Sequence, residues 1–295
     1  MKLQTKLLIL YALSTIFIIL AMGVFFYDRL WEERLESIRE DMRNQLQHVD
    51  FAVNSFFNDV ESDINTLAAI DIVRTKDDRD FTNFLNADEK TFQYHIHNRE
   101  QQIIDIFNNY RVTHPYVNSV YMGRENGASV RSHKRERPTR YDPRERPWYV
   151  LAKNNPEKVM MTEAYPSLTT SDVNIGVVKA LVDEKSNMYG VVGADVTLVN
   201  LTDYISNFKT NPSGKLILMD KNGVVLAGLG KDALFKDVKY YSPDVSRIVS
   251  EAVHGVVSVH IQNVEYYIFY RTASVQDWKI AALVPSVNIE KQIIG

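Results

Sequence analysis

The pattern of hydrophobic and polar positions begins with an uninterrupted apolar run. Residues 7–27 carry no charged side chain, and at about 1.5 Å per residue they can cross a hydrocarbon core of about 30 Å. We expect a retained membrane-spanning helix. A cleaved signal peptide is the alternative, but its apolar region is usually about 7 to 15 residues long, and no clear A-x-A cleavage site follows.

Charges on either side of this run predict its orientation. Lys2 and Lys6 precede the run, and a mixed-charge stretch follows it. The positive-inside rule therefore predicts that residues 1–6 are cytoplasmic and that everything after Tyr27 lies outside the membrane.

A long amphipathic helix is expected at residues 28–78, because apolar residues recur there at three- and four-residue steps. These positions are Leu35, Ile38, Met42, Leu46, Val49, Val53, Phe56, Val60, Ile64 and Leu67. No glycine or proline interrupts the pattern, so the helix extends roughly 60 Å from the membrane. We expect its distal half to pack on its own domain. The charge-rich proximal half, with a thin seam at Leu35, Ile38 and Met42, suggests a contact between two copies in a homodimer.

Beyond this helix the pattern changes to short β-prone runs. A second helix is expected at about residues 87–110, and a third at about residues 199–208. Between them, glycine, proline and polar clusters bound four predicted strand regions, at residues 116–123, 159–166, 172–183 and 188–198. The last two are joined by five polar residues and should form a hairpin.

A boundary at residues 210–214 precedes a second set of strands. Residues 215–228 predict a strand, a turn and a strand, and residues 256–285 supply three more strands. The fold class is therefore α/β (α+β), with two modules built on antiparallel sheets. We expect the membrane-distal module at residues 79–210, the smaller proximal module at 211–286, and a helix leading to a second span at 287–295.

Composition and motifs narrow the function. The net charge of -3 and the absence of a long basic stretch disfavour nucleic-acid binding. The chain has no cysteine, and it contains no G-x-S-x-G, H-E-x-x-H or phosphate-loop motif. His95 and His97 lie two apart in an expected helix and would not share a face, so metal binding is not expected. We expect no enzyme activity, no metal and no cofactor.

Candidate ligand chemistry is concentrated at Tyr141–Tyr149, "YDPRERPWY". The guanidinium of Arg146 and the indole N–H of Trp148 are donors suited to a carboxylate. In extended backbone they would point to the same face, and Pro147 between them restricts the backbone. Asp142 and Arg144 are expected to form a pair that stabilises a turn.

The strand at residues 190–198 supplies the complementary charge. Its alternation places Val192, Ala194, Val196 and Leu198 on one face and Gly193 and Asp195 on the other. Asp195 could accept hydrogen bonds from an ammonium group, and Tyr141, Tyr149 and Tyr165 could form the pocket wall. Together these groups suit a zwitterion. Alternatively, Arg146 and Asp195 pair with each other, and Trp148 and Tyr149 are core residues.

The order of a span, a long helix and two α/β modules, with "DPRERPWY" and "GVVGADVTL", resembles the double Cache sensor domains of prokaryotic chemoreceptors, histidine kinases and diguanylate cyclases. The resemblance covers nearly the whole chain. Members that bind free amino acids carry a matching set of residues, here Tyr141, Arg146, Trp148, Tyr149, Tyr165 and Asp195. The resemblance implies that the arginine and tryptophan hold the ligand carboxylate and the aspartate its ammonium. The arginine, tryptophan and aspartate also occur in Cache domains whose ligands are not amino acids.

We therefore expect a sensor in the cell membrane, with most of the chain extracytoplasmic. Its ligand is expected to be a small solute, first of all a free L-amino acid, and its output a cytoplasmic domain. The alternatives are a sensor for another carboxylate or an amine, a membrane-anchored extracytoplasmic enzyme, and a purely structural dimerisation stalk.

Overall fold

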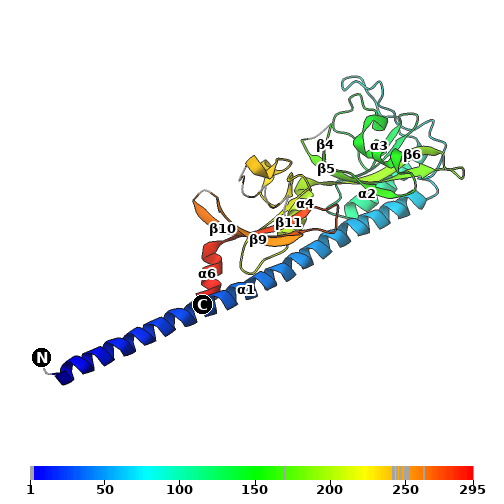
Figure 1. The fold of residues 1–295 in the computed structure, drawn as a ribbon. Helices are drawn as coiled ribbons and strands as arrows, with labels where there is room; N and C mark the ends of the chain where they lie inside the picture. The colour runs from blue at the N-terminus through cyan, green and yellow to red at the C-terminus, as the bar shows by residue number, and fades with distance from the viewer. Residues whose placement is uncertain are drawn as a thin grey trace.

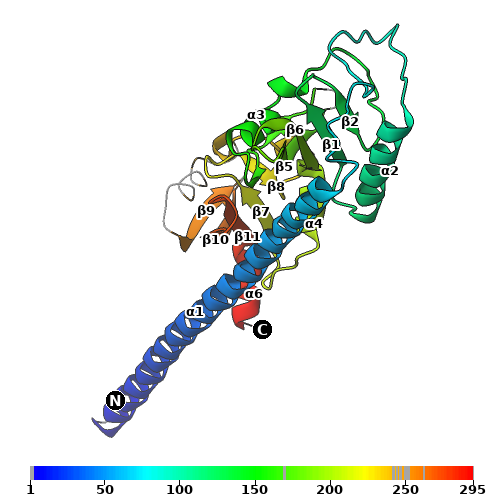
Figure 2. The ribbon, with the colours of Figure 1, turned by 90° about the vertical axis from the view of Figure 1, so that its right-hand side faces the viewer.

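The computed structural model describes residues 3–168, 171–240, 243, 245, 248, 253–261 and 263–294. Lys2, which entered the predicted orientation of the span, lies outside the described residues. One helix, α1 (Leu3–Ala69), runs along the whole molecule, and two modules built on β-sheets lie along its C-terminal part (Figures 1 and 2). The first module in the chain lies at the end farthest from the N-terminus.

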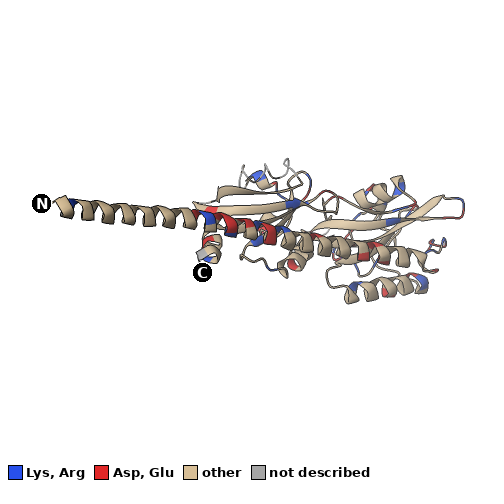
Figure 3. Ribbon diagram, turned by 60° about the horizontal axis from the view of Figure 1, so that its bottom comes forward, with Lys and Arg blue, Asp and Glu red and all other residues tan. Residues whose placement is uncertain are grey.

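The α1 helix is continuous over 67 residues, which corresponds to a length of roughly 100 Å. Its N-terminal part is exposed and apolar, with a mean hydropathy of 2.6 over the most apolar window. It is long and apolar enough to cross a membrane. Figure 3 shows this uncharged segment, followed by a charged stretch where the helix reaches the proximal module. The helix ends at Ala69, before the predicted limit at residue 78.

The expected dimer seam is wrong, because its three residues are buried within the chain. The exposed fraction is 8% for Leu35, 4% for Ile38 and 0% for Met42, and all three belong to the main hydrophobic core. The reason is that β10 (Val264–Thr272), β11 (Lys279–Pro285) and α6 (Ser286–Ile294) contact α1. The proximal module therefore covers the face that was assigned to a second copy.

The distal module is built on an antiparallel sheet of order β2-β1-β6-β5-β3, with β4 paired to β5. The strands are β1 (Ser119–Arg124), β2 (Ser129–Arg131), β3 (Val159–Met161), β4 (Tyr165–Pro166), β5 (Val173–Val182) and β6 (Met188–Thr197). The predicted hairpin of β5 and β6 is present. Helices α1 and α2 (Asn98–Thr113) contact this sheet, and the short helix α3 (Pro147–Asn154) packs against β5 and β6.

The predicted helix at residues 87–110 begins only at Asn98. The preceding segment forms an aromatic cluster instead: the ring centroids of Phe84 and Phe92 are 5.0 Å apart, and those of Phe92 and Tyr94 are 5.1 Å apart. This packing is incompatible with a regular helical stripe. His95 and His97 consequently precede α2 rather than lying within it.

The proximal module follows α4 (Leu198–Ser206) and is a second antiparallel sheet of order β8-β7-β11-β10-β9. Its remaining strands are β7 (Lys215–Met219), β8 (Val225–Ala227) and β9 (His254–Ile261). Short 3-10 helices occur at Pro143–Glu145, Lys231–Ala233 and Val238–Tyr240. The five strands predicted for this module are all present.

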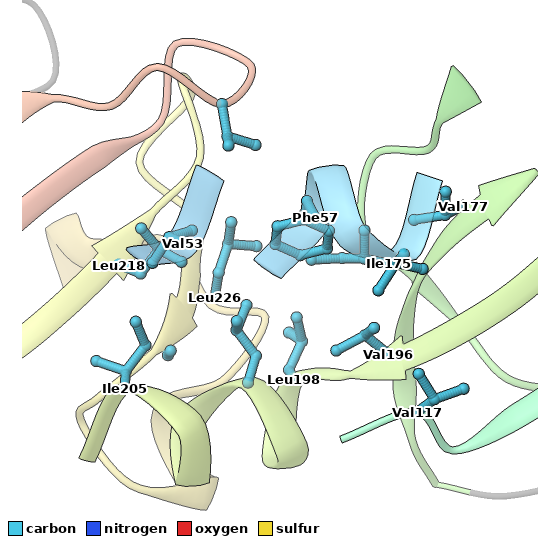
Figure 4. Close-up of a cluster of buried hydrophobic side chains, with 14 of the residues drawn as sticks. Val53, Phe57, Val117, Ile175, Val177, Val196, Leu198, Ile205, Leu218 and Leu226 are labelled. Atoms are coloured by element: carbon cyan, nitrogen blue, oxygen red, sulfur yellow. The ribbon is translucent and has the colours of Figure 1, made fainter. Parts of the chain in front are cut away.

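One hydrophobic core continues through both modules. Figure 4 shows side chains from α1, from α4 and from both sheets meeting at the junction: Val53, Phe57, Val117, Ile175, Val177, Val196, Leu198, Ile205, Leu218 and Leu226. The interior of a protein is close-packed, so a displacement of one of these elements is felt by its neighbours. The two modules and α1 therefore share their packing at this junction.

Candidate functional site

The candidate site is a cavity of about 250 Å³ in the distal module. Its floor is one face of the first sheet, and its walls come from α2, from the segment that precedes α2 and from the loop between β2 and α3. Alternation along β1 and β6 puts Ser119, Tyr121 and Asp195 on this face. The opposite face, which carries Val192 and Ala194, is core, as the sequence pattern predicted.

Asp195 lies at the centre of a buried hydrogen-bond network. Its Oδ1 accepts hydrogen bonds from the hydroxyls of Tyr121 at 2.7 Å and Tyr165 at 2.9 Å, and its Oδ2 accepts one from the Asn174 amide at 3.1 Å. A Cβ added at Gly176 would lie 3.0 Å from the Tyr121 hydroxyl and 3.3 Å from Asp195 Oδ1. A glycine at this position therefore leaves room for the tyrosine hydroxyls and the carboxylate.

The electrostatics of Asp195 favour a cationic partner. Burial raises the pKa of Asp195 to about 6, although hydrogen bonds from the two tyrosines oppose the shift. A carboxylate has about four lone-pair positions, and three of them are used here. Asn174 Oδ1, which is also buried, has no hydrogen-bond partner among the described residues. The network therefore still offers acceptors to a group with several N–H donors.

Arg146 and Trp148 also line the cavity. The Arg146 guanidinium donates to the Pro166 carbonyl at 3.0 Å and lies 5.6 Å from the centroid of the Tyr165 ring. Arg146 has the extended backbone that was expected before a proline. Pro147, however, starts α3, so Trp148 is in the first helical turn and the two residues do not share one extended segment. A proline at the first helical position is favourable because its missing N–H would have no partner there anyway.

Of the six residues singled out from the sequence, the cavity brings together Tyr141, Arg146, Trp148, Tyr165 and Asp195. Tyr149 is buried beside the Trp148 ring and is not part of the described lining. Burial raises the pKa of Tyr149 to about 12. Because consecutive helical residues point in different directions, only one of the two adjacent aromatic residues reaches the cavity.

Two further expectations concern charge pairing. Arg144 donates from its backbone N–H and its guanidinium to Asp142, at 3.0 and 2.7 Å, so the predicted turn pair is confirmed. Asp195 and Arg146 were also considered as partners of each other. Among the described residues, Asp195 accepts hydrogen bonds within the buried network, whereas Arg146 donates to the Pro166 carbonyl.

Several residues of the site were not predicted from the sequence. Tyr121 and Asn174 complete the network around Asp195, while Arg131 and Arg135 reach the cavity from β2 and from the loop after it. Alternation in the strand around Tyr121 could have placed that ring on the same face as Asp195. Nothing in the sequence alone indicated that the basic loop after β2 folds over the sheet.

The sequence of the chain is similar to those of chemotaxis proteins. Methyl-accepting chemotaxis protein McpA of Pseudomonas putida is 32% identical over 138 residues, which are 46% of this chain and 21% of McpA. Methyl-accepting chemotaxis protein McpB of Bacillus subtilis is 27% identical over 187 residues, 62% of this chain and 26% of McpB. The matched region thus spans about a fifth to a quarter of the length of these relatives.

Solved structures show the same fold. The ligand-binding domain of the Pseudomonas fluorescens chemoreceptor CtaA, in complex with L-isoleucine, superposes with a TM-score of 0.63 at 20% identity, covering 87% of this chain and 97% of that domain. The ligand-binding domain of the Campylobacter jejuni chemoreceptor Tlp3, in complex with 4-methylisoleucine, gives a TM-score of 0.63 at 19% identity, covering 89% and 94%. These similar proteins are sensor domains of chemoreceptors, not enzymes. A family model of the Cache domain matches residues 34–293, and the chain therefore belongs to the Cache family, with the two modules of its double form.

Proposed function

We propose that this chain is the extracytoplasmic sensor region of a transmembrane receptor and that it binds a free L-amino acid in the distal cavity. The observation that carries the proposal is the buried Asp195 carboxylate, which has spare acceptors beside it and the donors Arg146 and Trp148 in the same cavity. The amino-acid ligands of the CtaA and Tlp3 domains support it.

The geometry assigns a role to each end of the zwitterion. The ammonium group would donate to Asp195 and to the unpartnered Asn174 Oδ1. The carboxylate would accept from the planar Arg146 guanidinium and the Trp148 indole N–H. The cavity volume of about 250 Å³ is below the range typical of drug-sized ligands, which suits a small metabolite.

The location follows from α1. Residues 7–27 would cross the membrane with residues 1–6 in the cytoplasm, and the rest of α1 would connect the span directly to the distal module. The C-terminal helix α6 lies beside α1, at the end of the proximal module that is nearer the proposed span (Figure 1). The matched relatives are chemotaxis proteins several times longer than the matched region, so we propose a chemotaxis output; a histidine kinase or diguanylate cyclase output is the alternative.

A homodimer would form along a different face of α1 from the one expected at first. Opposite the buried face lies an uncharged stripe at alternating four- and three-residue steps, which we call the outer stripe: Asn44, His48, Phe51, Ser55, Asn58, Ser62, Asn65 and Ala69. Near its end, Asn65 accepts a hydrogen bond from Lys179 of β5. Phe51, near the centre of the outer stripe, is 72% exposed. The spacing is that of a coiled-coil seam, with Phe51 as its large apolar residue and polar residues at most other positions. The outer stripe is the contact that we propose with a second copy of α1.

The experiment is a thermal-shift screen of the 295-residue chain in lipid nanodiscs. Before the screen, the protein is dialysed against denaturant to remove bound solutes and is then refolded. A ligand that binds only the folded state at a hundredfold excess over its Kd stabilises it by about 2.7 kcal/mol. We expect one or a few of the twenty L-amino acids to raise the Tm. Simple carboxylic acids and simple amines are screened in parallel.

The outcomes separate the candidate functions. If only a carboxylic acid or only an amine raises the Tm, the sensor binds that class instead of amino acids. Mass spectrometry of the incubated ligand tests the enzyme alternative, because a sensor returns its ligand unchanged.

A further inference from the structure

The cavity lining includes residues other than the proposed zwitterion anchors, and we call the part of the cavity beside them the second lobe. This lobe lies between α2, the segment before α2, and the residues of β2 and the loop after it. Its basic side chains are Arg131, Lys134 and Arg135. An amino acid anchored at Arg146 and Asp195 would direct its side chain toward other residues of the lining, among which are these basic side chains.

Among the described residues the two arginines of the lobe form no ion pair, although the charge of Arg131 opposes the burial that raises the pKa of Asp195. Arg131 lies on the floor, directly across the strand pair from Tyr121, and among the described residues its side chain has no hydrogen bond or ion pair. Arg135 is only 9% exposed; its guanidinium lies 3.9 Å from the centroid of the Tyr141 ring, and its Nε has no hydrogen-bond partner in the described part of the chain. A buried guanidinium without a carboxylate is costly unless a ligand supplies one.

The acidic side chains that face the cavity do not balance these cations. The lining contains four cations, Arg131, Lys134, Arg135 and Arg146, and two carboxyl groups, Glu100 and Asp195. Glu100 accepts a hydrogen bond from the Thr82 backbone N–H at 3.1 Å, and burial raises its pKa. Burial and the charges of Arg131 and Arg111 lower the pKa of His133 to about 4, so this ring adds no charge at neutral pH. A zwitterion alone would leave the excess of positive charge in place.

We infer that the second lobe binds the carboxylate of an acidic side chain, so that the ligand class is a dicarboxylic amino acid, L-aspartate or L-glutamate. This inference rests on the proposed function, because it assumes the zwitterion anchors. Arg131 and Arg135 are then specificity-determining residues. A guanidinium holds a carboxylate by charge-assisted, often bidentate hydrogen bonds, whereas a neutral side-chain amide lacks the negative charge.

The test compares isosteric ligands on the whole chain in nanodiscs by isothermal titration calorimetry. L-Glutamate and L-aspartate should bind at least about tenfold more tightly than L-glutamine, L-asparagine and L-norvaline, because the amides match in size but not in charge. Amides or L-norvaline that bind as tightly as the acids would overturn the acidic assignment and leave the amino-acid function intact. Tight binding of succinate, which lacks an ammonium group, together with no binding of any amino acid would overturn both.

A variant locates the preference. Arg131→Gln should reduce the ratio of glutamate to glutamine affinity at least about tenfold while glutamine still binds. Arg140→Gln removes the same charge from an exposed position outside the described lining and should leave the ratio unchanged. An unchanged ratio in Arg131→Gln would assign Arg131 to balancing Asp195 and overturn its role in specificity. If Arg131→Gln does not fold, the ligand comparison on the unmodified chain still decides the ligand class.

Discussion

At the scale of single residues, the cavity separates two arginines that the sequence places two positions apart. Arg146 faces the cavity, whereas Arg144 pairs with Asp142 in the turn before α3. We expect Arg146→Ala and Asp195→Ala each to weaken amino-acid binding at least a hundredfold, since each removes the partner of a ligand charge, a loss on the order of 3 kcal/mol or more. Calorimetric titration measures the change.

Arg144→Ala is the matched control. It removes the same charge from the same loop but leaves the lining intact, so affinity should change by less than about threefold. If Arg144→Ala weakened binding more than Arg146→Ala, with both proteins equally folded, the guanidinium that holds the ligand would have been assigned to the wrong residue.

Asp195 also predicts how stability varies with pH. Its pKa is raised from 3.8 to about 6, because burial disfavours the ionised form. A carboxyl group whose pKa is raised on folding binds more protons in the folded state than in the unfolded state between these two values. Its contribution to the free energy of unfolding is therefore largest below about pH 4 and falls, by on the order of 3 kcal/mol, as the pH rises through about 6.

The variant that removes this ionisation is Asp195→Asn. The Tm of the ligand-free variant should fall less than that of the unmodified chain between pH 4.5 and pH 8, and at pH 8 it should be at least as high. Stabilisation by amino acids should be lost. Thermal melts at several pH values test this, and equal pH dependence of the two proteins would show that Asp195 titrates normally in the folded state.

Residue patterns predicted which strand and turn residues reach the cavity better than they predicted the loop that encloses it. Arg146 could be placed from the turn chemistry of its segment, and Asp195 could be placed from the alternation along its strand. Arg135 could not be placed, because its position over the Tyr141 ring depends on how an irregular loop folds across the sheet. Tyr149 was misplaced for a related reason: an extended segment was expected where Pro147 starts a helix.

At the scale of elements, α1 has two faces with different roles. The buried stripe packs on this chain, so the proposed homodimer must use the outer stripe. The chain contains no cysteine, and single-cysteine variants therefore report cleanly. Phe51→Cys and Ser55→Cys should form disulfide-linked dimers in membranes under mild oxidation, because seam positions of paired helices face each other. Electrophoresis without reductant measures the dimer fraction.

Arg43→Cys is the control for this prediction, because position 43 is exposed on α1 but lies beside the outer stripe. It should crosslink much less than Phe51→Cys. Equal crosslinking at all three positions would indicate random collision, and the absence of any dimer would exclude pairing along the outer stripe.

The elements were predicted well where one periodicity dominated. The long stripe of α1, the β5–β6 hairpin and the five proximal strands follow directly from spacing and turn residues. The spacing did not predict which element packs against each face of α1, because periodicity indicates that Leu35 is buried but not which element covers it. The C-terminal hairpin, more than 200 residues later, provides that cover, and only the tertiary structure shows this.

At the scale of the whole molecule, α1 is coupled to the proximal module by a buried carboxylate. Asp50 is 4% exposed and accepts hydrogen bonds from the backbone N–H and the hydroxyl of Ser274, at 2.7 and 3.0 Å. It also pairs with Arg271 at 3.1 Å. These contacts connect the middle of α1 to the end of β10 and the turn after it. A ligand-dependent shift of the modules would therefore reach α1 at this point as well as at the shared core.

Asp50→Ala tests this coupling. Removal of one partner leaves the half-buried Arg271 guanidinium without its carboxylate, so the free energy of unfolding should fall by on the order of 3 kcal/mol. The ligand affinity of the distal cavity should change little, because Asp50 does not line it. Any ligand-dependent change in the crosslinking rate of Phe51→Cys should become smaller, because a ligand shifts a conformational equilibrium only through contacts that differ between the two states.

Asp41→Ala, an exposed change on the same helix, is the control and should alter none of the three measurements. If Asp50→Ala lowered stability but left the ligand-dependent crosslinking unchanged, the displacement would have to pass through the hydrophobic junction around Phe57 and Leu198 alone.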